Sequence, residues 1–308
     1  MNTGPMSRTT VNKNMQDSFP PEILEIVVEF SSSDKTTLQS FSLVSTTCLA
    51  LARKHLFAYI TIRPPKSIAG SGVDARFAIP PKPSHAHVSM CSKLLAIIEA
   101  SKRRRCRLGT FVPFIRHLHI QEGSGRMTRW IAKDSSLLLL LPALFNLVSF
   151  RLSHIGPMPV FWAEIPVTLR NAIIRDVLSQ STLVEIGLCG MVFENPNQVN
   201  SLLGSCRGLR MLEFCHSGVQ QEGGVEVETD ENVEKPTLDT LTLGPFTPIL
   251  FVRSLLHSSC PIRVNTVRKL CLSVTGNFSD FVRLVLASTT LETLELVLTN
   301  PCERFLQI

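Results

Sequence analysis

The chain has 308 residues, of which 44% are hydrophobic and 18% charged, and its formal net charge is +6. This composition supplies core for two ordinary domains or one elongated domain, and it excludes a globally disordered protein. The nine cysteines form no Cys-x-x-Cys pair, which argues against a disulfide framework and favours free thiols in a reducing compartment.

The N-terminus lacks the apolar core of a secretory signal. The longest leucine run, Leu137 to Leu141, is far shorter than the roughly 20 residues that a membrane helix needs. We therefore expect a soluble protein of the cytoplasm or nucleus.

Residues 1–17 are polar and unpatterned and are predicted to form a disordered tail. A helix is predicted to begin at Pro20-Pro21-Glu22, because proline suits the first helical turn and an acidic residue complements the helix dipole. Asp34 is a candidate N-cap for a second helix, and a third apolar cluster lies in residues 49–57. These three short helices carry more apolar surface than they can bury among themselves, which predicts a partner.

The same stretch resembles the F-box, in the form found in mushroom-forming fungi. The residues that carry the resemblance are Phe19-Pro20-Pro21-Glu22-Ile23-Leu24, Asp34 to Leu38, Phe41 to Ser45, and Arg53 to Phe57. Two departures are Phe19 in place of the usual leucine and Ser45-Thr46-Thr47-Cys48 in place of a Cys-Arg-x-Trp sequence. The resemblance implies a three-helix domain over residues 19–62 that docks on a Skp-type adaptor through apolar contacts from Pro20, Pro21, Ile23, Leu24, Leu43 and Val44.

An apolar-x-x-apolar-x-apolar pattern occurs seven times after residue 110. Its occurrences are Ile115-Leu118-Ile120, Leu147-Phe150-Leu152, Leu183-Ile186-Leu188, Leu209-Leu212-Phe214, Leu238-Leu241-Leu243, Val267-Leu270-Leu272 and Leu291-Leu294-Leu296. The last two apolar positions are two residues apart, so they share one face of a strand. Strands stacked in parallel would bury that face as a continuous core.

Segments with helical periodicity occupy the gaps between these patterns, as parallel strands require. They are residues 166–179, 198–203, 248–257 and 278–287. The alternation resembles the irregular leucine-rich repeat, and we predict an α/β solenoid with a curved parallel sheet over residues 111–308. No polar cap is evident at its C-terminus, so we expect the solenoid either to be truncated there or to pair with something else. The asparagine usual three residues after the third apolar position is missing from most repeats. An ordinary doubly wound α/β domain is the alternative, but the chain has no glycine-rich phosphate loop.

Residues 63–110 are predicted to be an insertion with one helix, residues 88–100, followed by a basic loop that holds Lys102 to Arg105 and Arg107. The sequence contains no nucleophile elbow, phosphate-binding loop or His-Glu-x-x-His motif. We therefore expect no catalytic residue, no metal site and no cofactor. His85 and His87 are more simply part of a solvated loop, because no further ligand follows at a suitable spacing.

Residues that alternate with the core positions are predicted to line the concave face of the solenoid, where repeat proteins recognise partners. They are His117, His119, Ser149, Arg151, Glu185, Met211, Glu213, Thr240, Thr242, Lys269, Thr293 and Glu295. This face is basic at one end and acidic toward the middle, which favours a protein of mixed charge over a nucleic acid.

Two hypotheses remain open. The chain is either the substrate receptor of a cullin-RING ubiquitin ligase, or a leucine-rich-repeat scaffold outside ubiquitin transfer whose N-terminal helices only cap the solenoid. The first predicts that aspartate at Leu24 and Val44 abolishes adaptor binding. The second is favoured by Cys48, which stands where the F-box commonly has a tryptophan.

Overall fold

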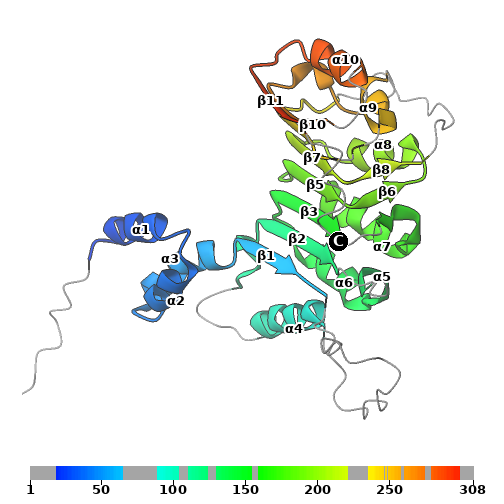
Figure 1. The fold of residues 1–308 in the computed structure, drawn as a ribbon. Helices are drawn as coiled ribbons and strands as arrows, with labels where there is room; N and C mark the ends of the chain where they lie inside the picture. Colours follow the sequence, from blue (N-terminus) through cyan, green and yellow to red (C-terminus); the bar gives the residue numbers. More distant parts are fainter. Residues whose placement is uncertain are drawn as a thin grey trace, which may run out of the picture. The chain divides into compact units, whose positions relative to one another are not determined.

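The computed structural model describes residues 19–64, 89–103, 110–123, 130–154, 159–220, 235–245, 247, 249–257, 260–274 and 279–298. The chain divides into two compact units, residues 1–56 and 57–308 (Figure 1). The predicted N-terminal tail, His85, His87 and most of the predicted basic loop lie outside the described residues.

The first unit consists of three helices, α1 (Pro21–Phe30), α2 (Lys35–Ser42) and α3 (Thr46–Leu56). Proline occupies the first turn of α1, where a backbone N–H would have no helical partner. The carboxylate of Asp34 caps α2 by accepting hydrogen bonds from the N–H groups of Thr36 and Thr37, at 2.9 and 3.2 Å. The pKa of Asp34 is lowered mainly by a hydrogen bond from the Thr37 hydroxyl, and the two backbone N–H groups lower it further.

The core of the first unit is small. Its fully buried cluster consists of Val28, Leu38 and Ala52, one residue from each helix, with Phe41, Leu51 and Leu56 packed against it. Most of the apolar side chains of α1 lie outside this core.

The second unit is built on an eight-stranded parallel sheet whose strands follow one another in chain order (Figure 1). The strands are β1 (Tyr59–Ile62), β2 (His117–Glu122), β3 (Ser149–His154), β5 (Glu185–Cys189), β7 (Met211–Cys215), β9 (Thr240–Leu243), β10 (Lys269–Val274) and β11 (Thr293–Leu298). A doubly wound sheet reverses its strand order at a switch point, and this sheet has no such reversal among the described strands.

All seven occurrences of the apolar pattern become neighbouring strands of this sheet. Two rows of register partners cross β2 to β11, and their members are Leu118, Phe150, Ile186, Leu212, Leu241, Leu270 and Leu294, then Ile120, Leu152, Leu188, Phe214, Leu243, Leu272 and Leu296. In each row every member before β11 is at most 2% exposed. The parallel sheet that the pattern predicts is therefore present, and equivalent positions of the pattern are register partners in it.

Helices cover the apolar face of the sheet and complete its core. In the second unit they are α4 (Met90–Arg103), α5 (Trp130–Lys133), α6 (Ser135–Leu140), α7 (Val167–Ala172, continued by a π-helix, Ile173–Leu178), α8 (Pro196–Gly204), α9 (Ile249–Leu256) and α10 (Ser279–Ala287). A short parallel sheet of β4 (Val160–Phe161), β6 (Met191–Phe193) and β8 (Gly218–Val219) lies on the same side of the large sheet (Figure 1). Within this core Phe214 stacks on Phe251 of α9, with ring centroids 3.7 Å apart.

Short polar side chains link neighbouring repeats. Ser217, three residues after Phe214, donates a hydrogen bond to the carbonyl of Leu188 at 3.1 Å and accepts one from the N–H of Met191 at 3.0 Å. It therefore links the turns that follow β5 and β7.

At the other end of the strands a polar residue precedes the first apolar position of several repeats and donates to a carbonyl of the previous repeat. The donors and acceptors are Asn146 and Pro113, Thr182 and Leu147, Thr266 and Leu238, and Thr290 and Val267. This second ladder was not predicted from the sequence.

The boundary between the units differs from the predicted one. The F-box resemblance predicts that residues 57–62 belong to the N-terminal helical domain, but the helical unit ends at Leu56, and β1 pairs with β2. Phe57-x-x-Ile60-x-Ile62 is an eighth occurrence of the apolar pattern, and the β-branched residues of this stretch favour a strand. The helix predicted within the insertion is α4, and it runs three residues further than expected, to Arg103.

Adjacent residues of β7 provide a test of the stacked core. Leu212 is 1% exposed between Ile186 and Leu241, whereas Met211 is 42% exposed on the opposite face. We expect Leu212→Ala to lower the free energy of unfolding by about 2–5 kcal/mol, because it leaves a cavity that the strands cannot close. Met211→Ala should change it by no more than about 0.5 kcal/mol.

Denaturant unfolding followed by tryptophan fluorescence measures the free energy of unfolding of the second unit in both variants. Both tryptophans of the chain, Trp130 and Trp162, lie in residues 57–308 and therefore report on this unit. Equal losses in the two variants would contradict the assignment of the two faces.

Candidate functional site: the open face of the sheet

The face of the large sheet opposite the helices carries all twelve residues predicted for the concave surface. One row holds His117, Ser149, Glu185, Met211, Thr240, Lys269 and Thr293, and the next holds His119, Arg151, Glu213, Thr242 and Glu295. Ser149 is only 8% exposed, so it contributes little to the accessible surface.

The open face also contains residues that were not predicted. Tyr59 and Thr61 extend the two rows onto β1, while Gly187 and Cys271 complete the second row. A third row, closer to the carboxyl ends of the strands, contains Gln121, Ser153, Cys189 and Cys215. The two-residue alternation could have identified all of them, had it been extended along each strand.

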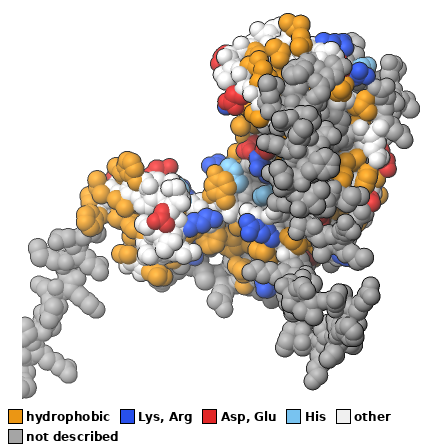
Figure 2. Space-filling model, in the orientation of Figure 1, with side chains coloured by type: hydrophobic (Ala, Val, Ile, Leu, Met, Phe, Trp, Pro, Cys, Tyr) orange, Lys and Arg blue, Asp and Glu red, His pale blue; other side chains and the backbone are white. Residues whose placement is uncertain are grey.

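Histidines and basic residues characterise the β1–β3 end of the open face (Figure 2). The ring of Tyr59 stacks on that of His117, with centroids 4.0 Å apart. His119 Nε2 lies 2.6 Å from the hydroxyl of Ser153. Burial lowers the pKa of His119, and the positive charges of Arg151 and Arg63 lower it further. The pKa of His117 is lowered mainly by burial, with Glu185 and Arg116 acting in opposite directions.

An ion pair between residues of two non-adjacent strands crosses the middle of the face. The guanidinium of Arg151 on β3 reaches across β5 and pairs with the carboxylate of Glu213 on β7. Gly187 lies between them, and a Cβ there would come within 2.9 Å of Arg151 Nε. Glycine at this position therefore allows the arginine to lie flat over the strand.

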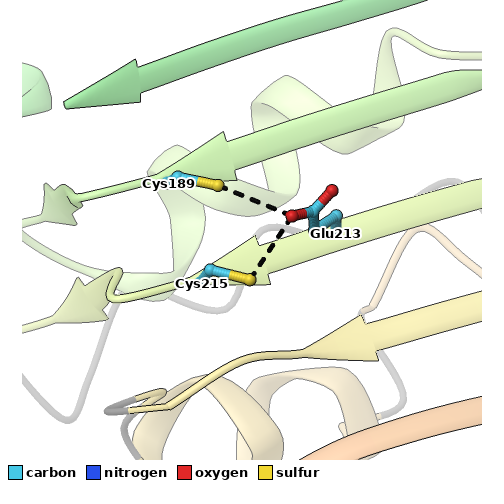
Figure 3. Close-up of side chains that lie close together, drawn as sticks. All are labelled: Cys189, Glu213 and Cys215. Carbon is cyan, nitrogen blue, oxygen red and sulfur yellow. Dashed lines mark hydrogen bonds between the residues drawn. The ribbon is translucent and has the colours of Figure 1, made fainter. Parts of the chain in front are cut away.

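Two thiols converge on the same carboxylate (Figure 3). Sγ of Cys189 and Sγ of Cys215 lie 3.8 and 3.5 Å from Glu213 Oε1. A hydrogen bond from the Cys215 thiol lowers the pKa of Cys189, whereas the same interaction and burial raise the pKa of Cys215. Among the described residues, these three form the one group of ligand-type side chains close enough to hold a metal ion.

The β10–β11 end carries a second ion pair. Lys269 Nζ lies 2.6 Å from Glu295 Oε1, and the thiol of Cys271 lies 3.1 Å from Glu295 Oε2. The hydrogen bond between Lys269 and Glu295 raises the pKa of the lysine and lowers that of the glutamate. The face thus changes along its length from histidines and arginines, through thiols with a carboxylate, to paired charges.

The residues predicted to contact an adaptor lie in the first unit. Pro20, Pro21 and Ile23 are exposed at the start of α1, and Leu24 is half-buried. Leu43 and Val44 follow α2 and are 87% and 73% exposed. Further exposed apolar side chains of this unit are Phe19, Ile26, Val27 and Phe30.

Neither a protein-family model nor a curated protein matches this chain. Of the helices that the structure describes, none combines the length and the apolar character needed to cross a bilayer.

The two histidines of the open face provide a paired electrostatic test. Arg151→Gln should raise the pKa of His119, because it removes a positive charge that opposes protonation, and should leave His117 unchanged. Arg116→Gln should raise the pKa of His117 and leave that of His119 unchanged. Histidine titration by NMR measures both pKa values in each variant. Equal movement of both histidines in either variant would contradict the described arrangement.

Proposed function

We propose that this chain is the substrate-recognition subunit of a cullin-RING ubiquitin ligase. In this proposal the first unit is an F-box-like domain that docks on a Skp-type adaptor, and the second unit is an irregular leucine-rich-repeat solenoid that holds a protein substrate. Ubiquitin transfer belongs to the other subunits, so the chain supplies no catalytic residue. The role places the chain in the cytoplasm or nucleus.

The observation that carries the proposal is the apolar surface of the first unit. Phe19, Phe30, Leu43 and Val44 are 69%, 87%, 87% and 73% exposed, whereas the packed core cluster among the described residues of the unit consists of Val28, Leu38 and Ala52. Exposed apolar surface of this extent on a small domain marks an interaction site. Phe19, Leu43 and Val44 lie on the segments, residues 19–24 and 43–44, whose sequence resembles the docking part of the F-box, and Phe30 extends the exposed surface to the end of α1.

The architecture of the second unit supports a repeat protein. Its strands are parallel and follow chain order, and two apolar rows continue across them in register. Each repeat contacts its neighbours through such rows and cannot bury its own apolar face alone. The Ser217 bridge stands where a leucine-rich repeat usually has asparagine.

The open face of the sheet is suited to a protein substrate of mixed charge. Its basic end contains Arg151 and the histidines, and Arg151 is already paired with Glu213. Lys269 is likewise paired with Glu295. Because these positive charges are balanced by neighbouring carboxylates, the face lacks the uniform positive field that phosphate backbones require.

A repeat scaffold without a role in ubiquitin transfer is the second candidate. Its support is the sequence Ser45-Thr46-Thr47-Cys48, where the F-box commonly has Cys-Arg-x-Trp. The Ser45 hydroxyl accepts a hydrogen bond from the N–H of Cys48, and Cys48 is buried at 3% exposure. A small buried thiol thus occupies the position of a large anchor, which would weaken docking.

Aspartate substitutions in the exposed apolar surface separate the two candidates. We expect Leu43→Asp and Val44→Asp each to weaken binding of a purified Skp-type adaptor at least about tenfold, because each removes an apolar side chain worth about 1.5–3 kcal/mol when buried. These positions are preferable to the half-buried Leu24, since their side chains contribute little to the unit's own core. Binding is measured by calorimetry with the full chain.

Phe145→Asp is the matched control, because Phe145 is 61% exposed in the second unit. It should leave adaptor binding unchanged. No adaptor binding by the unaltered chain would favour the scaffold, and undiminished binding by both Leu43→Asp and Val44→Asp would sink the proposed docking surface.

A further inference from the structure

The carboxyl ends of β5 and β7 bring Cys189, Glu213 and Cys215 together on the open face of the sheet. We propose that these three side chains bind one zinc ion, with water in the fourth coordination position. This inference does not depend on the proposed role in ubiquitin transfer.

The geometry of the cluster matches a tetrahedral zinc site. The two Sγ atoms and the carboxylate oxygen all lie within 4.8 Å of one another. Zinc bonds of about 2.3 Å to sulfur and about 2.1 Å to oxygen, at tetrahedral angles, separate sulfur from oxygen by about 3.6 Å. The observed separations from Glu213 Oε1 are 3.8 Å for Cys189 and 3.5 Å for Cys215. An ion could therefore enter with little movement of the ligands.

The chemistry of the donors selects a thiophilic cation. Thiolates favour zinc over magnesium and calcium, which prefer sites built from oxygen ligands. Two thiolates and one carboxylate around a divalent ion leave one net negative charge, and the guanidinium of Arg151 beside Glu213 offsets it. The cluster is half-buried, which leaves the fourth position accessible to water.

Neighbouring residues hold the ligands in place. Arg151 pairs with Glu213 Oε2, which leaves Oε1 directed at the two thiols. This is the type of outer-shell contact that orients a ligating carboxylate. Gly244 gives room to Cys215, because a Cβ at that position would lie 2.3 Å from its Sγ.

A second thiol and carboxylate on the same face provide an internal comparison. Cys271 lies 3.1 Å from Glu295 Oε2, but Cys271 and Glu295 belong to no group of three ligand-type side chains among the described residues. Cys271→Ser is therefore a matched control, because it removes a thiol that contacts a carboxylate but that is not itself a proposed zinc ligand.

The test uses the full chain, purified with a reductant that does not bind metal and then stripped of metal by a chelator. Zinc affinity is measured by competition with a chromophoric chelator, and zinc content by elemental analysis. We expect one zinc ion per chain at this site. Cys189→Ser and Cys215→Ser should each weaken its binding at least about 100-fold, Glu213→Gln about 10- to 100-fold, and Cys271→Ser less than about twofold.

Cobalt provides an independent readout. Cobalt in the unaltered chain should show thiolate-to-metal charge-transfer absorption that both Cys189→Ser and Cys215→Ser reduce. Far-ultraviolet circular dichroism of the metal-free variants checks that they are folded, so that lost binding is not lost structure. The proposal is overturned if the unaltered chain binds no zinc, if the serine variants bind it as tightly as the unaltered chain, or if a Cys189–Cys215 disulfide forms in place of the metal site under the same reducing conditions.

Discussion

The second unit depends on one packing constraint, the in-register stacking of two apolar rows across the parallel sheet. From Leu118 and Ile120 on β2 to Leu270 and Leu272 on β10, each strand buries two side chains between those of its neighbours. A shift of one residue in any strand would turn its apolar side chains to the open face. The polar bridges made by residues such as Thr182 and Ser217 fix the same register at the two ends of the strands.

The register also determines the open face. Arg151 and Glu213 are 62 residues apart in the chain and meet because β3, β5 and β7 are aligned with Gly187 between them. Cys189 and Cys215 meet because they are register partners. The set of side chains on this face therefore follows from the same packing that stabilises the unit: the apolar positions fix the alignment of the strands, and the intervening positions form the surface. The first unit differs from the second, because its core buries few side chains and many of its apolar side chains remain exposed.

Periodicity in the sequence was sufficient to predict seven strands and the twelve outward residues, because a two-residue alternation assigns faces without knowledge of the fold. The parallel arrangement was predictable from the helical segments that separate the patterns. β1 was missed, since Phe57 had been assigned to the end of the preceding helical domain. The thiol cluster was missed because Cys189 has no ligand-type neighbour at a metal-binding spacing in the chain. Only the pairing of β5 with β7 brings it to Glu213 and Cys215. Similarly, the pairing of Thr and Asn side chains with carbonyls of the previous repeat requires the register as well as the sequence.

The register between β9 and β10 can be tested by cross-linking to a native thiol. Thr242 is the register partner of Cys271, so the two Cα atoms lie about 4.8 Å apart, within the range for a disulfide. Thr240 is displaced by two residues, which puts its Cα about 8 Å from that of Cys271 and beyond that range. After mild oxidation and peptide mapping by mass spectrometry, we predict a disulfide to Cys271 in Thr242→Cys and none in Thr240→Cys. Cross-linking in the second variant but not in the first would contradict the register on which both faces of the sheet depend.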